Sequence, residues 1–139
     1  MTTPSETQTS PPSHHNLAPR RLRPQQLGSK DWGEEWLLAH TLLYTLKRLD
    51  MRAGTQGPLQ FHQVKDEAFV VHSGRVEVDH DDGTGHLVTR SVGPGEGYHI
   101  PPRTVHRVRA LVDTVMYEAS TPHFDDRVNC EAEYDGDAR

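Results

Sequence analysis

The chain has 139 residues, enough for one domain, and carries 15 Lys and Arg against 20 Asp and Glu, for a formal net charge of -5. This acidic balance argues against nucleic-acid binding, which needs a concentrated field of basic side chains. The single cysteine excludes an internal disulfide, and no stretch reaches the ~20 apolar residues of a membrane span or resembles a secretory signal, so we expect a cytoplasmic protein with no membrane partner.

The first thirty residues have the composition of a disordered tail. They contain five prolines, many Ser, Thr and Gln, and few large apolar side chains, so they cannot bury enough surface to offset the entropy cost of ordering. We assign residues 1–30 to this tail, residues 31–124 to one folded domain and residues 125–139 to an acidic C-terminal segment. In that last segment the carboxylates stand among few apolar residues, which predicts a second solvated tail.

From residue 32 onwards, short apolar segments alternate with turns rich in Gly, Pro and Asp about every ten residues, which is typical of an all-β sandwich or barrel. Residues 32–43 suit either a helix, by propensity, or an entering strand. The Ser73-Gly74 dipeptide predicts a tight hairpin between two strands. In chain order, we expect strands over 42–51, 67–73, 75–79, 86–92, 98–100, 105–111 and 114–120.

Four side chains have the spacing of a metal site. Gln60 and His62 sit two apart, so on a strand they point to the same face, ~6–7 Å apart along the chain. Glu67 begins the next strand, and if the two strands pair as a hairpin, its carboxylate reaches the same point. His106 follows a Pro-Pro corner and supplies a fourth group. Two imidazoles, a carboxylate and an amide oxygen suit one divalent ion such as Zn²⁺, Mn²⁺, Fe²⁺ or Ni²⁺.

This spacing resembles the two conserved motifs of the cupin superfamily. The first motif is filled by Gly54, Gln60, His62, Glu67 and Gly74, with glutamine in place of its first histidine. The second is filled by Gly95, Pro101 and His106, while Arg103 and Ala110 replace its Gly and Asn. The resemblance implies a double-stranded β-helix, or jelly-roll barrel, with one divalent metal held by Gln60, His62, Glu67 and His106. It also implies a homodimer.

Within that superfamily, the chain looks most like the small sugar-isomerase cupins similar to the type II mannose-6-phosphate isomerase domain. The likeness covers roughly residues 32–134, and glutamine at the first ligand position is ordinary in that group. Such domains often have an additional histidine at the position that Val64 occupies here. The resemblance implies an aldose-ketose isomerase that acts on a sugar or sugar phosphate and moves a proton through an enediol. The similar segments are 32–36, 59–62, 102–107 and 121–126.

Two residues are candidates for the acid/base group. Glu118 comes first, because it shares one face of a late strand with Met116 and Ser120, and an unpaired carboxylate inside a barrel is costly without a function. Lys47 comes second, because it interrupts an apolar face and aligns with a lysine of the isomerase-like group. Alternatively, Lys47 and Glu118 form a cross-strand ion pair.

Three residues are candidates for substrate binding. Arg107 and Arg109 share the strand face opposite His106, so either they point outward or the twist of the strand brings one to the rim, where it holds an anionic group. His99 either lines the cavity or is a hydrogen-bonded loop residue. Two other function classes stay open, because one barrel supports unrelated chemistries: an Fe²⁺-dependent dioxygenase and a non-catalytic cupin that binds a metal or small molecule.

Overall fold

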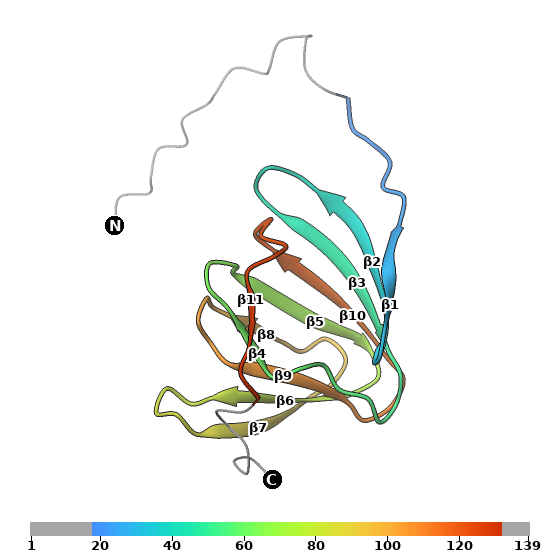
Figure 1. Cartoon of the computed structure of the whole chain (residues 1–139). Coiled ribbons are helices and arrows are strands. Elements are labelled where there is room, and N and C mark those ends of the chain that lie inside the picture. Colours follow the sequence, from blue (N-terminus) through green and yellow to red (C-terminus); the bar gives the residue numbers. More distant parts are fainter. Residues whose placement is uncertain (1–17, 132–139) are drawn as a thin grey trace, which may run out of the picture.

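A computed structural model describes residues 18–131, and over this range the chain forms eleven strands. They assemble into two antiparallel sheets that face each other (Figure 1), with the strand orders β1-β2-β3-β10-β5-β8 and β11-β4-β9-β6-β7. This arrangement confirms the all-β jelly roll. Within the described range, no helix is long and apolar enough to cross a membrane. The strands are β1 (Gln25–Lys30), β2 (Gly33–His40), β3 (Thr45–Met51), β4 (Gln60–His62), β5 (Glu67–Ser73), β6 (Val76–Asp81), β7 (Leu87–Val92), β8 (Gly97–Ile100), β9 (His106–Ala110), β10 (Thr114–Ser120) and β11 (Arg127–Asn129).

Two segments that composition assigned to solvated tails are strands at the edges of the sheets. Strand β1 pairs with β2, so the disorder expected over residues 1–30 is wrong for 25–30, and residues 1–17 lie outside the described range. Strand β11 pairs with β4, so the second tail is wrong for 127–129. Both strands are held by backbone hydrogen bonds on one side and expose most of their side chains, which leaves little apolar signal in their composition.

The structure decides between helix and strand near the start of the domain and corrects the turn expected at residues 73–74. Residues 33–40 form a strand rather than a helix, because β1 and β3 flank them and supply backbone partners on both sides. The hairpin expected at Ser73-Gly74 is wrong, since β5 and β6 belong to different sheets. Gly74 has φ +96°, and a Cβ there would collide with Thr114, so glycine permits the chain to cross between the sheets at this point.

The space between the sheets is apolar in one part and polar in another. The apolar core draws on both sheets and consists of Met51, Phe69, Val71, Val76, Val78, Val92, Ile100, Ala110 and Met116. On the same strands, polar side chains are buried further along. The register of the strands places these polar positions side by side. Glu118 lies opposite Lys47, and Ser120 lies opposite Glu67. A strand pattern that changes from apolar to polar therefore creates a polar cavity beside the core.

Candidate metal centre

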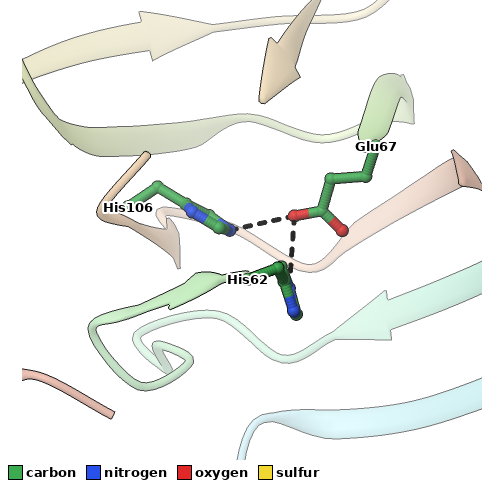
Figure 2. A group of neighbouring side chains, drawn as sticks. All are labelled: His62, Glu67 and His106. Atoms are coloured by element: carbon green, nitrogen blue, oxygen red, sulfur yellow. Dashed lines mark ion pairs between the residues drawn. The ribbon is translucent and has the colours of Figure 1, made fainter. Parts of the chain in front are cut away.

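Three buried side chains converge in this cavity: His62 on β4, Glu67 at the start of β5 and His106 at the start of β9 (Figure 2). The Oε1 atom of Glu67 lies 3.0 Å from His106 Nε2 and 3.7 Å from His62 Nε2. One ligand atom from each residue lies within 4.8 Å of the other two, which makes the group able to hold a metal ion. The glutamate reaches the histidines from the opposite sheet and not, as expected, across a hairpin from β4.

Gln60 lines the same cavity and is the direct cross-strand neighbour of His106. Its Oε1 atom is buried and has no hydrogen-bond partner among the described residues. Leaving a buried amide oxygen unsatisfied costs free energy, and a metal ion would satisfy it. Two imidazoles, one carboxylate and this orphaned amide oxygen therefore fit a divalent ion of intermediate hardness.

Hydrogen bonds on the far side of each imidazole turn its Nε2 atom toward the centre. The Nδ1–H of His106 donates to the carbonyl of Thr104 at 2.9 Å, and the Nδ1–H of His62 donates to Asp126 Oδ1 at 3.1 Å. A proton held on Nδ1 leaves Nε2 with a free lone pair. Burial lowers the pKa of His62, mainly because the charged imidazolium would lose its hydration, so this imidazole is neutral near pH 7.

Asp126 contacts a candidate ligand and is a residue that sequence reasoning missed. Besides holding His62, its Oδ2 atom accepts hydrogen bonds from the backbone N–H groups of Val64 and Lys65 at 2.7 and 2.8 Å. Burial alone would raise the pKa of Asp126, but these bonds and the contact with His62 lower it, so the group is a carboxylate. In the sequence, Asp126 was one of several acids in an apparent tail, and its partner lies 64 residues away.

Replacing Asp126 by asparagine is expected to weaken metal binding by ~10–100-fold, the usual effect of removing a group that orients a ligand. The reason is that an asparagine amide cannot hold the His62 Nδ1–H as strongly as a carboxylate does. Calorimetric titration of the metal-free protein with Zn²⁺ or Mn²⁺ measures the change. The matched control is Asp31→Asn, which removes the same charge from an exposed residue that does not line the cavity. Equal weakening in both variants would assign the effect to overall charge and contradict the orienting role.

A second buried cluster adjoins the ligand carboxylate. The ammonium group of Lys65 lies 3.0 Å from Glu67 Oε2 and 3.4 Å from Glu118 Oε1. Lys65 is only 7% exposed. The sequence analysis did not propose it as a site residue, because nothing in the local sequence indicates that this loop lysine is buried. Burial would lower its pKa, but the two carboxyl groups raise it, so the side chain is a cation.

The two carboxyl groups of this cluster differ in protonation. Burial, assisted by the hydrogen bond and charge of Glu67, raises the pKa of Glu118 to about 8. Burial would also raise the pKa of Glu67, but hydrogen bonds from Glu118 and His106 and the charge of Lys65 lower it below its usual range. Near pH 7, Glu67 is therefore a carboxylate able to bind a cation, and Glu118 is a neutral acid that holds a proton beside it.

Lys47 lines the cavity but does not pair with Glu118. Although the two residues are opposite each other on β3 and β10, the Lys47 ammonium binds Glu35 Oε1 at 2.7 Å and lies 5.3 Å from the Phe124 ring centre. The alternative of a Lys47–Glu118 ion pair is therefore wrong, because β2 supplies Lys47 with a closer carboxylate.

Each of the three residues expected to bind substrate is paired with a carboxylate outside the candidate metal centre. Arg107 and Arg109 both bind the buried carboxylate of Asp79, at 2.9 and 3.2 Å, although parts of Arg107 also line the cavity. The side chain of His99 is 63% exposed, does not line the cavity, and binds Asp66 Oδ1 at 2.6 Å. A cavity role for His99 is wrong, because on β8 its neighbour Ile100 takes the inward position and packs into the core.

The cavity has a volume of about 570 Å³, room for a small organic molecule beside a metal ion. Both sheets line it, together with residues 124, 125 and 127 near the C-terminal end of the described range. A candidate metal site, the Glu118 carboxyl group and three lysine residues thus share one cavity. Such an arrangement can bind a polar small molecule and move a proton on it.

Comparison with known proteins identifies the architecture. A family model described as "Cupin domain" matches residues 47–123. Among solved structures, the chain is similar to the capsular polysaccharide assembling protein CapF from Staphylococcus aureus, with 20% identity and a TM-score of 0.67, over 85% of this chain and 33% of that one. It is also similar to KdgF from Halomonas sp., with 22% identity and a TM-score of 0.64, over 73% and 89% of the two chains.

A third similar structure is oxalate decarboxylase from Bacillus subtilis, with 14% identity and a TM-score of 0.68, over 83% of this chain and 33% of that one. The chain thus spans about a third of the length of CapF and of oxalate decarboxylase. At these identities the similarity shows the fold alone. A search of curated proteins found no significant match.

Proposed function

We propose that this chain, which belongs to the cupin domain family, is a metal-dependent enzyme that isomerises a sugar or sugar phosphate by proton transfer between adjacent carbons. The observation that carries this proposal is the position of the Glu118 carboxyl group, which shares one cavity with the candidate metal ligand Glu67 and lies 3.4 Å from the Lys65 ammonium. A carboxyl group whose pKa is raised inside a cavity is typical of catalytic sites, which supports an acid/base role for Glu118. CapF is described as a polysaccharide assembling protein, which supports a carbohydrate substrate.

Gln60, His62, Glu67 and His106 would hold one divalent metal ion, with Asp126 and the Thr104 carbonyl orienting the two imidazoles. A bound metal ion stabilises negative charge on a substrate oxygen. The identity of the ion is open between Zn²⁺, Mn²⁺, Fe²⁺ and Ni²⁺. Oxalate decarboxylase of Bacillus subtilis has Mn(II) centres, so the fold is compatible with manganese.

Glu118 would be the acid/base group of the reaction. As a carboxylate it would take a proton from one substrate carbon, and the resulting carboxyl group would give that proton to the adjacent carbon. A pKa of about 8 makes both forms accessible near neutral pH. Lys65, at 3.4 Å, would stabilise that carboxylate when it forms. Lys47, already bound by Glu35, would remain a second acid/base candidate, opposite Glu118 on the neighbouring strand.

Solvent deuterium exchange tests the proposal. Metal-loaded protein is incubated anaerobically in D₂O with a panel of aldoses, ketoses and their phosphates, and the products are examined by NMR. An isomerase incorporates deuterium at the carbon next to the carbonyl and converts aldose to ketose without oxygen. Absence of both exchange and conversion across the panel would contradict the proposal. The cytoplasmic location and the homodimer stay predictions.

An Fe²⁺-dependent dioxygenase is the second candidate, and one observation favours it. Two histidines and one carboxylate, His62, His106 and Glu67, form the donor set that non-haem iron oxygenases use with open coordination positions. Oxygen uptake that requires iron and is absent with Zn²⁺ or Mn²⁺ would support this candidate. A protein that shows neither exchange nor oxygen uptake would be a metal- or small-molecule-binding cupin.

A further inference from the structure

The cavity carries more cations than carboxylates, although the whole chain has a net charge of -5. Five basic residues line it: Lys30, Lys47, Lys65, Arg107 and Arg127. Four acidic residues line it: Glu35, Glu67, Glu118 and Asp125. A divalent ion at the proposed site would increase this positive surplus. A local excess of positive charge attracts ligands of negative charge.

Four of the five cations already have a carboxylate partner. The distances are 3.9 Å for Lys30 and 2.7 Å for Lys47, both to Glu35. Lys65 binds Glu67 at 3.0 Å, and Arg107 binds Asp79 at 2.9 Å. Within residues 18–131, the guanidinium of Arg127 has no ion-pair partner. Among the five cations, Arg127 is therefore the one for which the described part of the chain supplies no carboxylate.

The position of Arg127 directs it toward the metal centre. On β11 it is the direct cross-strand partner of His62 on β4, and such antiparallel partners point to the same face of a sheet. Since His62 faces the cavity, Arg127 lies on the cavity side and lines it, but it is exposed where His62 is buried. The adjacent residue, Asp126, is anchored to His62 and to the 64–65 backbone, so the start of β11 is held in place.

We propose that Arg127 recognises an anionic group of the substrate and that the enzyme therefore acts on acidic sugars, either uronates or sugar phosphates. This inference rests on the proposed function and defines its substrate class. A guanidinium group binds carboxylate and phosphate oxygens through paired hydrogen bonds. Arg107 and Arg109, which the sequence offered for this role, are occupied by Asp79.

Calorimetric binding to the metal-loaded full chain tests the proposal with matched sugars. The probes are glucose, glucuronate and glucose 6-phosphate, of which the last two add a carboxylate and a phosphate. We expect at least one anionic probe to bind ~10-fold or more tightly than glucose, since hydrogen bonds to charged groups are the strong ones. Arg127→Gln should remove that preference without changing glucose binding or metal content, and Arg127→Lys should keep part of it.

The matched control is Arg90→Gln, which removes an exposed arginine on β7 that does not line the cavity. It should leave the preference unchanged. The ratio of the affinities for glucuronate and glucose 6-phosphate distinguishes recognition of a carboxylate from recognition of a phosphate. Equal affinities for neutral and anionic probes, or a preference that survives Arg127→Gln, would overturn the role of Arg127.

Failure of the proposed function is distinguishable from failure of this inference. If no sugar binds or reacts, the carbohydrate proposal fails, and sulfate, which carries no sugar, then tests Arg127 directly. The NMR signal of the Arg127 side-chain Nε–H, assigned by its loss in Arg127→Lys, is followed while sulfate is added. A saturable shift of this signal, with no comparable shift for Arg90, supports an anion site, and no shift overturns it.

Discussion

Replacing His106 by alanine is expected to remove the bound metal. His106 Nε2 lies 3.0 Å from Glu67 Oε1 and is one of three ionisable ligand candidates, so its loss leaves an incomplete donor set. The affinity should fall by more than the ~10–100-fold that follows from losing a group that only orients a ligand. Elemental analysis of protein dialysed after metal loading measures the effect, and the ratio should fall from one ion per chain to almost none.

The matched control is His99→Ala. Its imidazole is exposed, binds Asp66 and lies outside the cavity, so the variant should retain its metal. A second variant, His62→Ala, should behave like His106→Ala, because both imidazoles present Nε2 to the same carboxylate. Full metal content in His106→Ala, with a native circular dichroism spectrum, would contradict the four-ligand site.

Replacing Glu118 by glutamine is expected to lower turnover sharply and leave the metal site intact. Because burial and Glu67 raise the pKa of Glu118 to about 8, the native group is neutral near pH 7, and glutamine reproduces its size and neutrality. Glutamine cannot give or take a proton. Turnover should fall by ~10²–10⁴-fold, the usual contribution of a general acid or base. Steady-state assays and deuterium exchange measure the loss, and elemental analysis confirms the metal content.

The comparison with Lys47→Met separates the two acid/base candidates. Lys47 binds Glu35 and not Glu118, so its replacement should lower turnover much less than that of Glu118. If deuterium exchange persists in Glu118→Gln and disappears in Lys47→Met, the acid/base group is Lys47 and not Glu118. Exchange that persists in both variants would exclude both residues. Loss of metal from Glu118→Gln would show that Glu118 supports Glu67 structurally and would remove the basis for its catalytic assignment.

The strands that the sequence predicted well are those with a clear alternation of polar and apolar residues. On β10, Met116 and Glu118 keep one face toward the interior, as the period of two predicted. On β5, Glu67 and Phe69 do the same, although Glu67 was found by its spacing from His62. The edge strands β1 and β11 were not predicted, because their side chains are mostly exposed and their sequences do not alternate between polar and apolar residues.

The sequence by itself determined the fold class and the group of residues offered as metal ligands. Glycine and proline spacing, strand periodicity and the positions of Gln60, His62, Glu67 and His106 are all local features, readable along the chain. Lys65 and Asp126 had no such local signal. Each acquires its role from a partner on a distant segment, Glu118 for Lys65 and His62 for Asp126.

Only the tertiary structure decided how the charges pair. Asp79 on β6 occupies Arg107 and Arg109, Glu35 on β2 occupies Lys47, and Arg127 is left facing the cavity. The physical reason is that an ion pair forms between atoms a few ångströms apart, and which strands bring such atoms together depends on sheet order and register. These are properties of the assembled sheets, and no spacing within a single segment encodes them.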